Sequence, residues 1–380
     1  MAGRTLELEA FDTLRARVAN SLSDRGIVLT GLRGVGKTVL LNEMQRMASE
    51  QDWLTVRLEA RPDGAGAISA RRLLARELVA ASRKLARSSP TARMKEALGT
   101  ISSFNFKVGA TGVSLSIDRM EGRADSGDSE IDLLELVEDV APALAERRRA
   151  FGIFVDEMQD LDLEMSRALV AAQHAANQRD LPFYIIGAGL PSLPRVLTEA
   201  RSYAERLFEY RVIGRLSEAD ATLALTEPAQ RLGAAFTADA LRVLLDAADG
   251  YPYFIQVFGR TVWNLAAGPV IDVDDAIAAV QFGVEQLDAG FYQSRWERAT
   301  PAERRLMVAM AIDGDLPSST AAVAERLNQQ PSSLGPFRAR LIGKGLLYSP
   351  EHGQIAFTVP GMADHIHRRV DLDQLNDGAR

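Results

Sequence analysis

Eight consecutive residues near the N-terminus have the types and spacing of a phosphate-binding loop: Gly31-Leu32-Arg33-Gly34-Val35-Gly36-Lys37-Thr38. They fit the pattern G-x-x-x-x-G-K-[ST] in full. Glycines at 31, 34 and 36 permit positive φ values, so successive backbone N–H groups can approach an anion closely. Lys37 adds a positive charge for the β and γ oxygens of a nucleotide, and Thr38 adds a hydroxyl ligand for Mg²⁺.

The segments around this loop are those that a phosphate site needs. An apolar run at 27–30 predicts a strand, and the pattern that starts at Val39 predicts a helix whose N-terminus points at the phosphate. A second apolar run, 151–155, ends in Asp156 and Glu157. At the end of a strand, an aspartate can orient Mg²⁺ through its waters and a glutamate can polarise the attacking water. The two motifs together predict nucleotide hydrolysis.

The rest of the N-terminal half alternates strand and helix patterns. Further strands are predicted at 53–58, 182–189 and 208–213, and the helices between them at 5–21, 68–85, 131–149 and 163–178. This alternation predicts an α/β fold with a doubly wound, mostly parallel sheet. Two short alternating segments, 103–108 and 113–117, predict a β-hairpin around Gly109-Ala110-Thr111-Gly112.

The C-terminal half has a different pattern. The strand signal disappears after Ser217, and four helical segments predict an all-helical lid: 218–232, 237–248, 253–266 and 273–293. Three more helices (301–312, 320–327, 333–344) and a β-hairpin (345–348 with 354–359) follow in the order of a winged helix-turn-helix. We expect an ATPase core at 1–216, a lid at 217–297, a winged helix at 298–372 and a tail at 373–380.

Basic residues cluster in two places. Between 71 and 95 there are eight basic residues against one acid, Glu77, which indicates either a solvated helix face or contact with nucleic acid or an acidic partner. Between 326 and 350 there are four basic residues and no acid, and the predicted DNA contacts are Ser332, Ser333, Arg338, Arg340 and Lys344. Residues 301–380 carry nine basic and nine acidic side chains, so this region is neutral overall and contact with proteins remains open.

The composition excludes several classes of protein. With 47% hydrophobic and 25% charged residues and no apolar run of membrane-spanning length or signal core, we expect a cytoplasmic protein without membrane contact. The absence of cysteine excludes disulfides, thiolate metal sites and cysteine nucleophiles. His365 and His367 are two residues apart and fall on different faces of a helix, so a zinc pair is not expected. The net charge of −7 argues against a general polyanion binder.

The phosphate loop, acidic strand end, helical lid and winged-helix pattern together resemble AAA+ ATPases of the origin-recognition/initiator type and the related AAA 16-like proteins. The resemblance implies ATP and Mg²⁺ as ligands. It implies that Arg206, or failing that Arg201, reaches the γ-phosphate in a neighbouring subunit, which requires self-association. It also implies that the turn at Tyr251-Pro252 contacts the nucleotide base or sugar, although the same residues make an ordinary turn between helices.

Two departures from this family indicate slow turnover. The fourth strand ends in Gly187-Ala188-Gly189, where the family usually has a polar sensor, and no lid arginine sits in the usual register, although Arg260 is near enough to substitute. Fewer groups would then stabilise the charge that develops in the transition state. No Asn-Lys-x-Asp motif follows the fourth strand, so ATP is the expected nucleotide. Two hypotheses remain: an ATP-dependent switch that assembles on double-stranded DNA, and a signalling or scaffold ATPase that contacts proteins.

Overall fold

Five parallel strands form the sheet on which the phosphate loop and the acidic strand end are mounted. Their spatial order is β2-β3-β4-β1-β5, and every neighbouring pair is parallel. The strands are β1 (Gly26–Thr30), β2 (Leu54–Glu59), β3 (Phe151–Asp156), β4 (Phe183–Gly189) and β5 (Phe208–Val212). β1, β3 and β4 are buried along their whole length, because helices cover both faces of the sheet. The predicted doubly wound α/β fold is confirmed.

The computed structural model describes residues 1–61, 66–86, 91–108 and 119–377. The chain divides into two compact units. One unit holds residues 4–31 and 37–212, and the other holds residues 1–3, 32–36 and 213–380. Below, they are called the sheet unit and the C-terminal unit.

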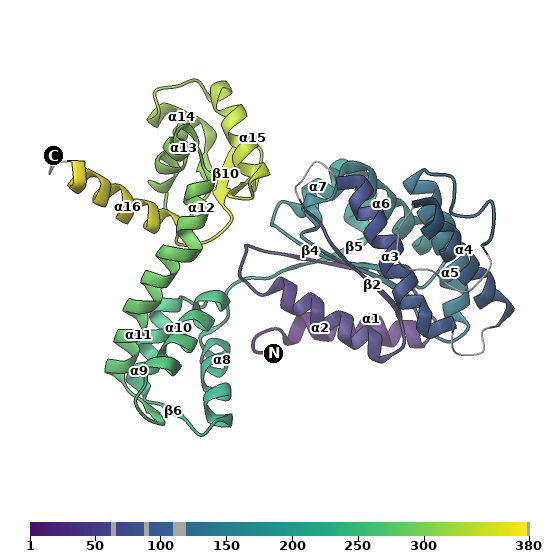
Figure 1. The fold of residues 1–380 in the computed structure, drawn as a ribbon, viewed down its shortest axis with the longest axis horizontal. Coiled ribbons are helices and arrows are strands. Elements are labelled where there is room, and N and C mark those ends of the chain that lie inside the picture. The colour runs from purple at the N-terminus through teal and green to yellow at the C-terminus, as the bar shows by residue number, and fades with distance from the viewer. Residues whose placement is uncertain (62–65, 87–90, 109–118, 378–380) are drawn as a thin grey trace. The chain divides into compact units, whose positions relative to one another are not determined.

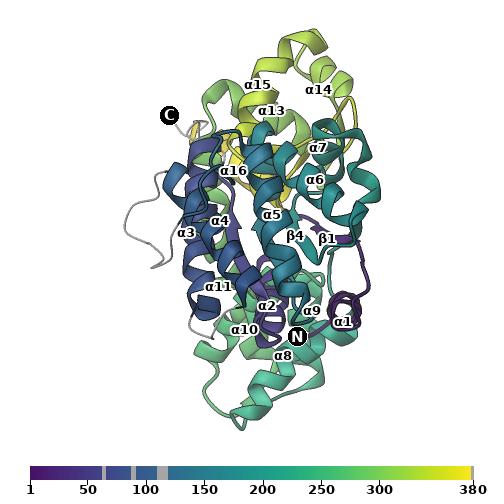
Figure 2. The same cartoon turned by 90° about the vertical axis from the view of Figure 1, so that its right-hand side faces the viewer.

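Helices cover both faces of the sheet (Figures 1 and 2). One face carries α1 (Thr5–Ala19) and α2 (Lys37–Glu50). The opposite face carries α3 (Gly66–Ala86), α4 (Ala92–Val108), α5 (Ser129–Ala145) and α6 (Leu163–Gln178). The short α7 (Leu193–Ala200) and the 3₁₀ turn η2 (Ser202–Arg206) lead from β4 into β5.

The predicted hairpin at 103–117 is wrong in its first half. Residues 103–108 are the end of α4, whose buried side chains recur at helical spacing: Met94, Ala97, Leu98, Ile101 and Phe104. The second half, 113–117, and the turn 109–112 lie outside the described residues. The basic stretch is only partly a solvated face, because Arg71 forms an ion pair with the fully buried Asp132 of α5.

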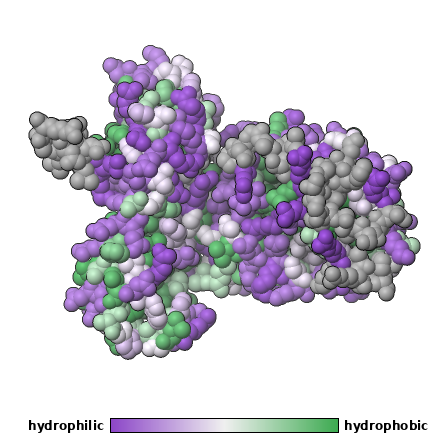
Figure 3. Space-filling view, viewed as in Figure 1, coloured by the Kyte–Doolittle hydropathy of each residue, from purple (hydrophilic) through white to green (hydrophobic). Residues whose placement is uncertain are grey.

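The first part of the C-terminal unit is helical, as predicted. It consists of α8 (Glu218–Arg231), α9 (Ala238–Ala248), α10 (Pro252–Leu265) and α11 (Val273–Gln286), followed by a π-helical turn (Leu287–Tyr292) and α12 (Gln293–Arg298). The expectation that no strand occurs here is wrong, because β6 (Ala235–Phe236) pairs in parallel with β7 (Val270–Ile271). Figure 3 shows hydrophobic patches on the surface of this part. Its exposed large hydrophobic residues include Leu232, Trp263, Val270 and Phe282.

The last part of the C-terminal unit combines helices with a small antiparallel sheet in the order β8-β10-β9. Its elements are α13 (Pro301–Ala311), β8 (Ser318–Ser319), α14 (Thr320–Arg326), the 3₁₀ turn η4 (Pro331–Leu334), α15 (Gly335–Gly343), β9 (Leu347–Tyr348), β10 (Gln354–Phe357) and α16 (Met362–Asp377). The helix α16 continues to Asp377 and so crosses the predicted start of the tail at 373. Among the described residues, no helix has the length and apolarity to span a membrane.

Candidate nucleotide-hydrolysis site

The phosphate loop joins the end of β1 to the start of α2. Gly34 and Gly36 have φ values of +90° and +93°, a region that L side chains rarely adopt. Gly31 does not have a positive φ, contrary to our expectation. Gly31 directly follows the last residue of β1, and its N–H donates to the carbonyl of Gly189 in β4 at 3.1 Å. Two of the three glycines are therefore required by backbone conformation.

Lys37 and Thr38 open α2 directly after the loop. Lys37 is 6% exposed, and its Nζ donates to the carbonyl oxygen of Gly31 at 2.9 Å. Thr38 and Val39 are exposed, and Val35 is buried. An ammonium held at the N-terminus of a helix, with exposed hydroxyl and N–H groups beside it, fits a nucleotide phosphate and a hard divalent cation.

Asp156 ends β3 and is buried. Its Oδ2 accepts a hydrogen bond from Arg57 of β2 at 3.0 Å, and its Oδ1 accepts from the N–H of Glu157 at 3.0 Å. A carboxylate and the Thr38 hydroxyl are oxygen donors of the kind that Mg²⁺ prefers. A metal ion at Asp156 would share this carboxylate with the Arg57 guanidinium. In the described part of the chain, no three or more His, Cys, Asp or Glu residues gather in a group that could hold a metal ion.

Glu157 has an unusual backbone conformation, with φ at +48°. Its carboxylate accepts a hydrogen bond from Nε2 of Gln159 at 2.7 Å, and Oε1 of Gln159 accepts from the N–H of Leu190 at 2.9 Å. Sequence reasoning missed Gln159. The available signal was an amide two residues after the Asp-Glu pair, facing a neighbouring strand that ends in glycine.

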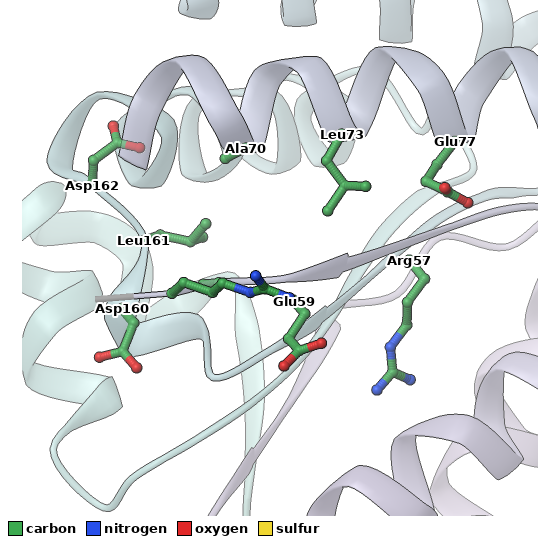
Figure 4. A pocket seen from close by; sticks show the side chains of 10 residues that line it. Arg57, Glu59, Ala70, Leu73, Glu77, Asp160, Leu161 and Asp162 are labelled. Atoms are coloured by element: carbon green, nitrogen blue, oxygen red, sulfur yellow. The ribbon is translucent and has the colours of Figure 1, made fainter. Parts of the chain in front are cut away.

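Within the sheet unit, a cavity of about 530 Å³ lies beside the C-terminal end of β2 (Figure 4). Ala70, Leu73 and Glu77 of α3 face Arg57 and Glu59 of β2 across it. Residues 160–162 lie at one end. No phosphate-loop residue lines this cavity, so it is distinct from the loop itself.

The two candidate trans arginines differ in exposure. Arg206 ends η2, and its side chain is 84% exposed, with Glu205 at 3.9 Å. Arg201 forms an ion pair with Glu130 of α5 at 2.5 Å. Arg206 is therefore the better placed of the two to reach a second subunit.

Tyr251 and Pro252 begin α10 in the C-terminal unit. The Tyr251 hydroxyl donates to the carbonyl of Arg33, a phosphate-loop residue of the same unit. Tyr251 is buried, and burial raises its pKa. The side chain is thus a neutral hydrogen-bond donor next to the loop backbone. Arg260 lies further along α10 and is exposed.

All three basic residues among the predicted DNA contacts have hydrogen-bond partners inside the protein. Arg340 Nε donates to Oε1 of Glu303 at 3.0 Å, and Lys344 Nζ donates to Oε2 at 2.6 Å. Glu303 is fully buried in α13. Arg338 donates to the Ser349 hydroxyl at 2.7 Å. The remaining two predicted contacts, Ser332 and Ser333, are exposed.

Comparison with known proteins extends these observations. Residues 1–186 match the model of the AAA ATPase domain. This part of the chain is therefore similar to AAA ATPase domains. A second model, Domain of unknown function (DUF8462), matches residues 289–366. No curated protein matches the sequence.

Two solved structures are similar in fold to this chain over most of its length. One is a Walker-type ATPase of Pyrococcus abyssi, with 15% identity and a TM-score of 0.56, covering 94% of this chain and 95% of that one. The other is the ORC2 protein of Aeropyrum pernix in its ADP form, with 12% identity and a TM-score of 0.52, covering 99% and 95%. The fold of this chain is thus similar to the fold of these two proteins.

Proposed function

We propose that the AAA ATPase domain binds ATP with Mg²⁺ and hydrolyses it slowly to ADP and phosphate. The observation that supports this most directly is that the β1 and β3 ends present Lys37, Asp156 and Glu157 at one edge of one parallel sheet. That edge is where open α/β sheets bind their ligands.

Each residue has a role that follows from its chemistry. Loop N–H groups and Lys37 would hold the β and γ phosphates, while Thr38 and Asp156 would hold Mg²⁺, which neutralises phosphate charge when bound. Glu157 would accept the proton of the attacking water. The lack of a lid arginine in the usual register leaves one group fewer to stabilise the charge of the transition state, which supports a slow rate.

The proposal extends to assembly. A switch ATPase of this kind associates with further copies of itself, and Arg206 would stabilise the γ-phosphate bound by a neighbouring copy. Its 84% exposure and its place at the end of η2 support this role.

The first test compares ATP binding and hydrolysis in three variants of the full chain. Lys37→Ala should lose ATP affinity. Glu157→Gln should keep ATP affinity and lose hydrolysis by roughly 10²- to 10⁴-fold, as expected for a general base. Lys95→Ala changes an exposed lysine of α4 and should behave as wild type. A wild type that binds no ATP, or a Glu157→Gln variant with full activity, would refute the assignment.

We further propose that residues 298–372 form a winged helix that binds double-stranded DNA when the ATPase is in its ATP state. The order α13, α14, α15 followed by the β9–β10 ribbon supports it. Exposed Ser332 and Ser333, at the turn before α15, are suited to phosphate contacts.

One observation favours the alternative, a scaffold ATPase that contacts proteins. Glu303 forms ion pairs with both Arg340 and Lys344, and its charge offsets one of the two positive charges that a DNA phosphate would need. The same part of the C-terminal unit has a groove of about 540 Å³, with an apolar floor that includes Val308, Ala309 and Ile312.

Duplex binding at two salt concentrations separates the two functions. The DNA switch predicts salt-dependent binding that ATP strengthens and that Arg338→Ala with Arg340→Ala weakens. Absence of binding by a folded, ATP-bound chain would favour the protein-contact function.

A further inference from the structure

A side-chain amide links the Glu157 carboxylate to the neighbouring strand. Gln159 lies in the 3₁₀ turn η1 (Met158–Asp160), which follows β3. Its Nε2 donates to Oε2 of Glu157 at 2.7 Å, and its Oε1 accepts from the N–H of Leu190, directly after β4, at 2.9 Å. One residue thus bridges the ends of two adjacent strands of the sheet.

The chemistry of its partners fixes the orientation of this amide. The Leu190 N–H can only donate, so it must face the amide oxygen. An ionised Glu157 carboxylate can only accept, so it must face the amide nitrogen. A flipped amide would lose both hydrogen bonds. Gln159 is therefore held in one orientation by the backbone of β4 and in turn holds the carboxylate.

The glycines of β4 make room for this turn. A Cβ at Gly189 would lie 2.4 Å from Oε1 of Gln159, and a Cβ at Gly187 would lie 2.6 Å from Sδ of Met158. Contacts this short do not occur in folded proteins. The two positions lack side chains because η1 occupies the space that those side chains would fill.

The backbone of Glu157 contributes to the same arrangement. Its left-handed conformation is unfavourable for a residue other than glycine. The Asp160 N–H donates to the Glu157 carbonyl at 2.8 Å, which closes the turn and brings Gln159 back towards the Glu157 side chain. Local strain of this kind is typical of functional positions.

We propose that Gln159 is the positioning residue of the ATPase site and takes the place of the polar side chain that β4 lacks. It orients the Glu157 carboxylate for proton transfer from the attacking water and acts through Glu157. This role rests on the proposed ATP hydrolysis by Glu157.

The test uses Gln159→Leu in the full chain, with a matched control that the chain itself offers. Gln173 of α6 hydrogen-bonds to the backbone at the start of β4. Its Oε1 accepts from the Ile185 N–H at 2.8 Å, and its Nε2 donates to the Phe183 carbonyl at 3.1 Å. Gln173→Leu likewise removes a side-chain amide that hydrogen-bonds to the backbone of β4, but it does not touch Glu157. Thermal unfolding of both variants shows how much stability each loses.

The readouts are the ATP dissociation constant and the single-turnover hydrolysis rate. Gln159→Leu should bind ATP as wild type does and hydrolyse it about 10- to 100-fold more slowly, the usual loss for a residue that orients a functional group. Gln173→Leu should hydrolyse at the wild-type rate. Gln159→Glu keeps the size and the acceptor for Leu190 but replaces the donor with a second carboxylate, so it should also lose hydrolysis.

A double-mutant cycle separates this role from a structural one. In a Glu157→Gln background, Gln159→Leu should have no further effect on the residual rate. Wild-type hydrolysis by Gln159→Leu, an equal loss in Gln173→Leu, or a full additional loss in the Glu157→Gln background would each overturn the inference. A wild type that binds ATP without hydrolysing it would instead refute the proposed function, and this role with it.

Discussion

Replacing Glu303 by glutamine should destabilise the protein in a way that depends on pH. Glu303 is the third residue of α13 and closes a capping box with Thr300, whose N–H donates to Oε2 at 2.8 Å. Burial alone would raise its pKa, but hydrogen bonds from Lys344, Thr300 and Arg340 outweigh burial and hold the pKa at about 2. The folded protein therefore depends on the ionised form.

The magnitude follows from that pKa. An ordinary glutamate has a pKa of 4.5, so a folded value of about 2 corresponds to about 3 kcal/mol of stability at pH 7. Because the folded pKa is depressed, this contribution is complete above the unfolded value and is lost as the pH falls from 4.5 through 2. At pH 3.5 about 2 kcal/mol should remain. Arg340 and Lys344 keep 52% and 30% exposure, so water can solvate them in the variant.

The assay is urea unfolding of the full chain at pH 7 and at pH 3.5, with Glu325→Gln, an exposed glutamate of α14, as the control. Glu303→Gln should lose about 3 kcal/mol at pH 7 and about 2 kcal/mol at pH 3.5, while the control stays within about 0.5 kcal/mol of wild type at both. A loss that is equal at the two pH values, or below about 1 kcal/mol at pH 7, would refute the argument from charge.

Three further outcomes are expected. Arg71→Met leaves the fully buried Asp132 without its cation, so the free energy of unfolding in urea should fall by about 3 to 5 kcal/mol. A loss below about 1 kcal/mol would show that the ion pair is unimportant. Arg206→Ala should leave ATP affinity unchanged and lower the rate of the assembled protein by about 10³-fold or more, and an unchanged rate would exclude it as a trans residue. Gly189→Ala should cost about 1 to 3 kcal/mol and also slow hydrolysis, because its Cβ displaces Gln159; normal turnover would contradict this.

Much of the sheet unit could be predicted because its signals are local. β1, β3 and β4 are buried on both faces, so each is a continuous apolar run in the sequence. The phosphate loop is a single contiguous motif whose chemistry needs no distant partner. No helix was predicted at α4, and Gly109 and Gly112 suggested a hairpin over its last residues, whereas the apolar residues from Met94 to Phe104 follow a helical period.

Pairing over long separations could not be predicted. The basic residues of α15 were counted from the sequence, but Glu303 lies 37 residues from Arg340 and 41 from Lys344, and only the fold brings the three together. A local excess of positive charge therefore overstated the charge that α15 offers to DNA. In the folded protein, Glu303 offsets part of the positive charge of α15.

At the end of β4, by contrast, the sequence understated the polar groups that the fold brings together. Gly187 and Gly189 indicated a missing polar group, yet the polar group is present and comes from Gln159, about 30 residues earlier in the chain. Its amide touches the carboxylate of Glu157 directly. The site therefore has a polar side chain at the end of β4, although β4 itself does not supply it. The rate of hydrolysis should then depend on how firmly the Gln159 amide holds the Glu157 carboxylate, rather than on which residue types occupy β4.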